Sequence, residues 1–236
     1  VALAVSVIPE GLPIAITIAL AVASTRMARR GVIVRRLGAV EGLGSCTLIA
    51  SDKTGTLTCN ELTVREVRLM DGGRFSVSGE GFLPRGDVRR ADRPASAGER
   101  IRDLARIAVL CNEGDLHEHD GQWIWRGDPT DIALLTFAHK LGMTRERELD
   151  AHAEVCRIPF EPERLFSAAF HRFGPEVRVM VKGAPERVLA MCADGDDDVR
   201  RRAKSTAEQM AASGLRVLAL AEGGVPEAVD PAAAPP

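Results

Sequence analysis

The hydrophobic and polar positions of this chain follow different patterns in different regions. From Val1 to Ala23 the sequence is almost wholly apolar, with Ser6, Glu10 and Thr17 as exceptions. About 20 consecutive apolar residues are enough to cross a bilayer as a helix. Beyond this run, short apolar or alternating stretches are interspersed with segments of helical periodicity. The pattern predicts one membrane segment followed by a region of mixed helices and strands.

The later segments can be assigned by their period and by the turn residues between them. Expected strands lie at residues 31–36, 46–50, 60–70, 74–77, 123–125, 154–160, 165–170, 177–181 and 215–221. Expected helices lie at residues 37–44, 99–111, 130–141 and 199–212, with a further helix after Pro185. Residues 79–98 and 117–119 are expected to be loops. Asp128 and Pro129 fit the cap and first turn of the helix that follows them, whose residues Ile132, Leu135, Phe137 and Leu141 are expected in the core.

The string from Asp52 to Thr58, DKTGTLT, follows the expected strand at 46–50. A strand fixes a carboxylate at its end, and the turn after it opens to solvent. Lys53 adds a positive charge, the threonines add hydroxyls, and Gly55 lets the backbone approach a ligand closely. A bare strand followed by a polar turn is the alternative. The uninterrupted seven residues favour a phosphate site with a carboxylate nucleophile.

The apolar run is interrupted by Ile8-Pro9-Glu10-Gly11-Leu12-Pro13. Two prolines and a glycine break helical hydrogen bonding, and the freed carbonyls are tolerated in a membrane where they line a cavity or bind an ion. A carboxylate there is costly and therefore functional by default, and it suits a hard cation such as Ca²⁺. A buried helix of a soluble protein and a re-entrant turn are the alternatives. The arginines from Arg26 to Arg36 indicate that this end faces the cytoplasm.

Composition narrows the function classes. A net charge of −2 gives no basic surface for nucleic acid, and an aromatic content of 4% without tyrosine disfavours base-stacking platforms. The five cysteines are scattered, with no CxxC spacing, which argues against a disulfide scaffold or a zinc site. A reducing compartment fits this use of cysteine.

Six separated strings occur in one order: PEGLP, DKTGTLT, GDPTDIALL, PFxxER, KGAPE and GLRVLALA. In that order the chain resembles the type II P-type ATPases, most closely the calcium-pump branch. The resemblance implies an α+β chain in four parts. These are a partial fourth membrane helix at residues 1–30, the first part of an α/β, haloacid-dehalogenase-like phosphorylation domain at 31–61, an antiparallel-sheet nucleotide-binding domain flanked by helices at 62–222, and a disordered tail at 223–236.

The resemblance also implies roles for individual residues. Asp52 would accept the γ-phosphate of ATP, Lys53 and Thr54 would hold it, and Asp52 with the Thr54 carbonyl would bind Mg²⁺. The implied nucleotide-binding residues are Asp131, Phe160, Arg164, Lys182, Gly183 and Arg216. Glu10 would bind the transported cation with the carbonyls of Val5, Ser6 and Ile8. For Phe160 a place in the core is the alternative, and for Lys182 an ordinary place on the surface.

Two positions depart from the family's pattern. Leu165 stands where the family commonly has a lysine, so that nucleotide affinity or phosphate contact would be weaker unless Arg164 substitutes, and Asp131 is one methylene shorter than the usual glutamate. The chain begins at Val1 inside an apolar run, and we expect it to be a fragment that binds ATP without turnover.

The implied partners are ATP, a transported cation, the bilayer and the rest of the pump, with no nucleic acid and with residues 31–236 on the cytoplasmic side. Ca²⁺ is the first choice of ion, ahead of Mn²⁺, Na⁺/K⁺ and H⁺. A stand-alone nucleotide-binding module and a soluble dehalogenase-superfamily phosphatase are the alternative functions.

Overall fold

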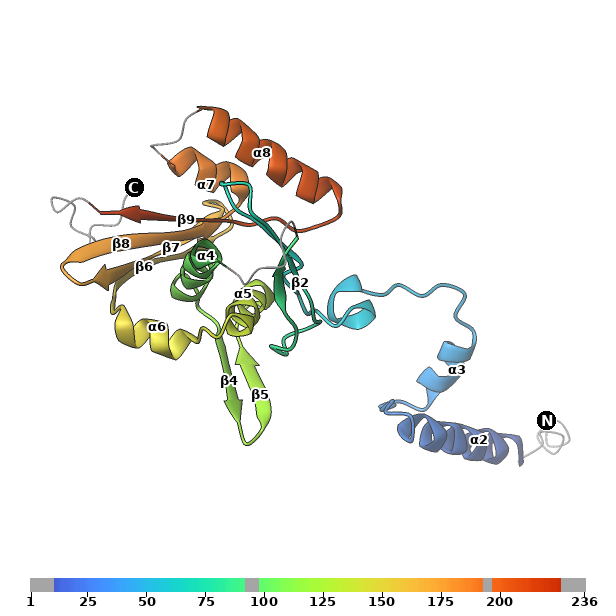
Figure 1. Cartoon of the computed structure of the whole chain (residues 1–236). Helices are drawn as coiled ribbons and strands as arrows, with labels where there is room; N and C mark the ends of the chain where they lie inside the picture. Colours follow the sequence, from blue (N-terminus) through green and yellow to red (C-terminus); the bar gives the residue numbers. More distant parts are fainter. Residues whose placement is uncertain (1–10, 92–97, 193–196, 226–236) are drawn as a thin grey trace, which may run out of the picture. The chain divides into compact units, whose positions relative to one another are not determined.

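The computed structural model describes residues 11–91, 98–192 and 197–225 (Figure 1). The chain divides into two compact units, Val1–Cys59 and Asn60–Pro236. Each unit is described by itself below.

The first unit contains the helices α2 (Gly11–Ala28) and α3 (Gly38–Gly44). Helix α2 is long and apolar enough to cross a membrane, judged by length and composition. Pro13 lies in its first turn, where a missing N–H costs no hydrogen bond. None of the residues of α2 is buried. The helix expected in the apolar run is therefore present from Gly11 onward.

The strands predicted at residues 31–36 and 46–50 are wrong, because neither segment is in a strand. A strand needs a neighbour to pair its backbone N–H and C=O groups, and in the described part of this unit no neighbouring strand offers them. The side chains of Leu48 and Ile49 are consequently 84% and 87% exposed. The dehalogenase-like sheet expected for residues 31–61 stays a prediction.

The second unit contains antiparallel sheets and helices (Figure 1). One sheet has the order β1 (Glu66–Arg68), β2 (Arg74–Val77), β3 (Val88–Arg90), and β4 (Asp115–His119) pairs with β5 (Gln122–Arg126). The largest sheet has the order β6 (Glu154–Glu161), β7 (Phe166–Phe173), β8 (Glu176–Gly183), β9 (Ala219–Gly224). The helices are α4 (Glu99–Leu110), α5 (Pro129–Lys140), α6 (Arg145–Ala151), α7 (Pro185–Met191) and α8 (Asp197–Ala212). This confirms the predicted combination of helices and antiparallel sheets.

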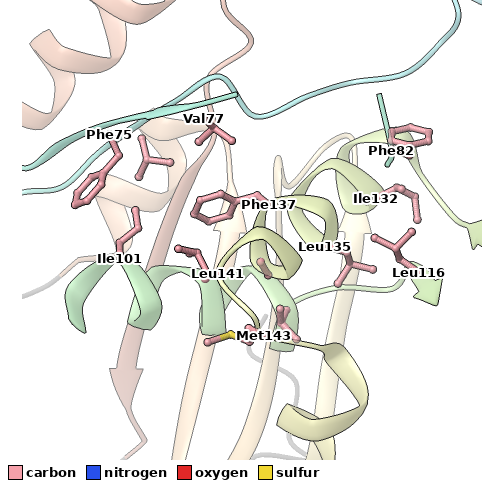
Figure 2. Close-up of a cluster of buried hydrophobic side chains, with 14 residues drawn as sticks. Phe75, Val77, Phe82, Ile101, Leu116, Ile132, Leu135, Phe137, Leu141 and Met143 are labelled. Carbon is pink, nitrogen blue, oxygen red and sulfur yellow. The ribbon is translucent and has the colours of Figure 1, made fainter. Parts of the chain in front are cut away.

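Helix α4 joins the two larger sheets because it is buried on two faces. Ile101, Ala105 and Val109 pack into a cluster with side chains of β2 and α5. In Figure 2, Phe137 of α5 lies between Val77 of β2 and Leu141, with Ile101 and Phe75 beside them. On the other face, Ile107, Leu110 and Cys111 pack against Ala169 of β7 and Met180 of β8.

Several elements differ from the predicted ones. The predicted loops at 79–98 and 117–119 contain strand β3 and part of β4, each of which is held by pairing with a strand next to it in the sequence. Helix α6 was not predicted. The last strand begins at Ala219 instead of Leu215, and the strand expected at 60–70 is reduced to Glu66–Arg68. For the strands, pairing with another segment set the bounds, and local periodicity does not contain that information.

The start of α5 agrees with the prediction. Asp128 has an extended backbone, and its carboxylate accepts a hydrogen bond from the Thr130 backbone N–H at 2.7 Å. Pro129 follows at the first helical position, where its fixed φ suits the helix. The predicted core residues Ile132, Leu135, Phe137 and Leu141 are buried. Two local signals therefore set the start of this helix, and its residues 131–138 are buried on all sides.

We expect Asp128→Ala to lower the free energy of unfolding by about 1 kcal/mol, because the Thr130 N–H loses its capping acceptor. Urea unfolding of the 1–236 polypeptide in detergent measures this through the chain's two tryptophans, Trp123 and Trp125, in β5. Glu118→Ala, which removes an exposed carboxylate from β4, is the control and should change little. Equal losses in both variants would contradict the capping role.

Candidate functional site

A buried ion pair joins the end of β8 to the start of α5. Lys182 lies one residue before the end of β8, and Asp131 lies in the first turn of α5. The two residues are 8% and 7% exposed, and the Lys182 ammonium contacts Asp131 Oδ1. Buried charges are costly unless they are paired and hydrogen-bonded. The alternative that Lys182 is an ordinary surface lysine is therefore wrong, and the structure brings two of the predicted nucleotide-binding residues together.

The Asp131 carboxylate is held on its other side by the backbone. Its Oδ2 accepts a hydrogen bond from the Glu113 N–H at 3.1 Å, so both oxygens have a partner. A carboxylate in the first turn of a helix also interacts favourably with the helix dipole. The turn at residues 112–114 thus fixes the orientation of the acid that faces Lys182.

That turn is closed by Asn112, which sequence reasoning did not single out. Asn112 is 1% exposed, and its Nδ2 donates to the carbonyls of Ala108 and Asp131 at 3.1 and 3.0 Å. Its Oδ1 accepts from the Gly114 N–H at 2.8 Å. A Cβ at Gly114 would lie 2.9 Å from Ile132 Cδ1, so a larger residue there would displace that side chain. An asparagine directly after a predicted helix end was the available signal.

Two arginines hold the same turn from its backbone side. The Asn112 carbonyl accepts from Arg145 at 3.1 Å and from Arg157 at 3.0 Å. A hydrogen bond and ion pair with Glu154 raise the pKa of Arg157 despite partial burial. Burial would raise the pKa of Glu154, but the hydrogen bond and charge of Arg157 outweigh it, and that pKa is lowered. Burial, followed by the charge of Arg157, lowers the pKa of Arg145.

The neighbouring strand β7 packs closely against the backbone around Lys182. Lys182 pairs with Ser167 of β7, whose carbonyl accepts a hydrogen bond from the Cys111 thiol at 3.4 Å. Burial raises the pKa of Cys111, although the charge of Lys182 opposes it, so the thiol stays protonated at neutral pH. A Cβ on Gly183 would lie 2.4 Å from the Leu165 carbonyl oxygen. Gly183 is thus required by strand packing, and it belongs with Lys182 to β8.

Phe160 lies near the end of β6, at a register irregularity between Ile158 and Glu161. Its side chain is 56% exposed, so the alternative that it belongs to the core is wrong. Arg164, in the turn that follows, forms an ion pair with Glu161 at 3.0 Å. Leu165 has a positive φ of 61° and is exposed. The register places Phe160 beside the part of β7 that contains Ser167, the partner of Lys182.

Arg216 lies elsewhere in the same unit. It is exposed and lines an apolar cavity of about 650 Å³, together with residues of β1, α7, α8 and β9. Asp131, Phe160 and Lys182 do not line this cavity. The structure therefore groups Asp131, Lys182 and Gly183 in one place, with Phe160 and Arg164 on the adjoining strand and turn, and leaves Arg216 on the wall of a different hollow.

The predicted phosphorylation residues belong to the first unit. Asp52 has an extended backbone, and a turn over Lys53–Leu57 follows, closed by a hydrogen bond from the Thr58 N–H to the Lys53 carbonyl at 3.1 Å. Gly55 takes a φ of 77° there. Asp52, Lys53 and Thr54 are exposed. Within residues 11–91, 98–192 and 197–225 no three His, Cys, Asp or Glu residues form a metal-binding group. Val5, Ser6, Ile8 and Glu10 lie outside the described residues.

The chain is similar to several known proteins of one family. Residues 100–233 match the family model described as "P-type ATPase, cytoplasmic domain N". The chain is 39% identical to a probable cation-transporting ATPase F of Mycobacterium tuberculosis, over 98% of the chain and 27% of that protein. It is 34% identical to a calcium-transporting ATPase of Bacillus subtilis, over 94% of the chain and 26% of that protein. It is 36% identical to the calcium-transporting ATPase type 2C member 1 of Bos taurus, over 94% and 24%. The chain spans about a quarter of each of these relatives.

We expect Lys182→Met to lower the free energy of unfolding by about 3 kcal/mol, because it leaves the buried Asp131 carboxylate without its cation. The double variant Lys182→Met/Asp131→Asn should lose less than the single variant, since no buried charge remains. Urea unfolding measures both, with the exposed Lys204→Met as control. If the double variant is at least as unstable as Lys182→Met, the loss in the single variant does not come from the unpaired Asp131 carboxylate.

Proposed function

The chain belongs to the P-type ATPases, as its sequence motifs predicted, and we propose on this basis that its second unit binds ATP beside Lys182. The observation that carries the proposal is the buried ion pair between Lys182 and Asp131 at the end of β8. Proteins seldom bury a lysine unless it is paired. Lys182 and Asp131 are also the residues that the family resemblance assigns to the nucleotide.

The surroundings of the pair suit a nucleotide. The half-exposed ring of Phe160 offers an apolar face on which a base could stack. Stacking of a base on an aromatic ring contributes about 1–3 kcal/mol to nucleic-acid binding, and the same contact is available to adenine. Arg164 presents a cation on the turn after β6, while Arg216 lies on the wall of the separate apolar cavity. Gly183 lets Lys182 lie close to β7 without a clash.

For the full-length protein we propose phosphoryl transfer to Asp52. A carboxylate oxygen of Asp52 would form a bond to the γ-phosphorus of ATP while the bond from that phosphorus to the bridging oxygen breaks, and ADP would leave with the electron pair. Lys53 and the hydroxyl of Thr54 would hold the phosphate oxygens. Mg²⁺ bound with ATP would neutralise phosphate charge. The Asp52 carboxylate and the Thr54 carbonyl are oxygen donors of the kind that this ion prefers, and both are exposed.

The proposed work of the whole protein is cation transport across a membrane. Helix α2 is long enough to span the bilayer, and the relatives compared above are named as cation- or calcium-transporting ATPases. We propose Ca²⁺ as the cation, held by Glu10 and the carbonyls of Val5, Ser6 and Ile8, with residues 31–236 on the cytoplasmic side. Mn²⁺, Na⁺/K⁺ and H⁺ are the other candidate ions.

A second candidate function is a nucleotide-binding module that acts without chemistry of its own. It is favoured by the second unit, which contains its own buried clusters and the ion pair, while Asp52 lies in the other unit. For the 1–236 polypeptide this proposal and the pump proposal agree on ATP binding and differ on phosphoryl transfer.

We expect Phe160→Ala to raise the Kd for ATP about tenfold, because the adenine loses its stacking surface. Isothermal titration calorimetry of the 1–236 polypeptide in detergent provides the measurement. Val155→Ala removes an exposed apolar side chain from the same strand and should leave the Kd unchanged. ATP binding that is equally tight in Phe160→Ala and in the unaltered polypeptide would exclude the stacking role.

A further inference from the structure

We propose that Asn112 is a positioning residue for the nucleotide site, acting through Asp131 on Lys182. The inference rests on the proposed binding of ATP beside Lys182. Asn112 would not touch the nucleotide itself, because it is 1% exposed and its amide faces the protein. Its effect would come from the carbonyls and N–H groups that its side chain connects.

The Asn112 side chain connects two helices and a turn. Its Nδ2 donates to Ala108 in the last turn of α4 and to Asp131 in the first turn of α5, and its Oδ1 accepts from Gly114. Ala108 lies where helix carbonyls have no partner further along the helix, and Asn112 provides one. The same side chain therefore ends α4 and ties the start of α5 to it.

Asn112 affects the ion pair through one backbone hydrogen bond. Closing the turn between Asn112 and Gly114 presents the Glu113 N–H to Asp131 Oδ2 at 3.1 Å. With Oδ2 held by that bond, Oδ1 of Asp131 faces the Lys182 ammonium. If the turn opened, the carboxylate would lose one of its two partners and could rotate away from the ammonium.

The backbone of the turn is held independently of the amide. Arg145 of α6 and Arg157 of β6 both donate to the Asn112 carbonyl. A change confined to the Asn112 side chain should therefore leave the chain in place and loosen the contacts with Ala108, Gly114 and Asp131. This separates the positioning role from the general stability of the fold.

Asn112→Asp provides the test, because aspartate has nearly the same shape but cannot donate to the two carbonyls. We expect it to raise the Kd for ATP about tenfold in the 1–236 polypeptide, measured by calorimetry. We also expect faster hydrogen exchange at the Glu113 amide, with exchange at Met180 in β8 unchanged. Thr136→Val is the matched control, since it removes another buried hydrogen bond within α5, from Thr136 Oγ1 to the Ile132 carbonyl at 2.8 Å. It should leave the ATP Kd unchanged.

An ATP Kd within twofold of the unaltered polypeptide in folded Asn112→Asp would overturn the inference. So would an equal loss of affinity in Thr136→Val, because a general loss of stability would then explain both. If Asn112→Asp does not fold, the smaller and neutral Asn112→Ser is measured against the same expectations. If the unaltered polypeptide binds no ATP, the proposed function fails. The exchange rate of the Glu113 amide then still decides whether Asn112 positions the acid.

Discussion

A lysine buried against an aspartate is the interaction on which the second unit depends. Burying an ammonium group is costly unless it is paired with an opposite charge. The fold that buries Lys182 must therefore also bring Asp131 to it. Strand β8 contributes the lysine, helix α5 contributes the acid, and the turn after α4 holds the acid in orientation. The exposed ring of Phe160 lies on β6, which is separated from the strand of Lys182 by β7.

Helix α4 makes this arrangement possible because it is apolar on two faces. One face packs with β2 and α5, and the other packs on β7 and β8. Its C-terminal end therefore lies where the largest sheet and α5 approach each other, and there Cys111 contacts Ser167 while Asn112 contacts Asp131. His171 adds a further tie, with one ring nitrogen 3.1 Å from the Leu110 carbonyl oxygen and the other 3.0 Å from that of His152.

The features that could be predicted from the sequence are those that depend on local signals. The cap at Asp128 and the strands that became β7 and β8 follow from neighbouring residues. Lys182 and Asp131 were found through motifs, but their contact spans 51 positions and could not be read from spacing. Residues 46–50 have the composition of a strand and no partner among the described residues, so they form none. Asn112 was missed because its hydrogen bond to the Asp131 carbonyl depends on the packing of α4 on α5.

We propose that ATP binds beside Lys182 and Asp131. The most direct measurement is a titration of the isotope-labelled 1–236 polypeptide with ATP, followed by amide ¹H–¹⁵N spectra. The claim predicts that the Glu113 and Gly183 amides, next to the ion pair, shift in proportion to bound ATP, while the Leu218 amide on the apolar cavity changes little. Shifts confined to the residues of that cavity, with Glu113 and Gly183 unmoved, would contradict it.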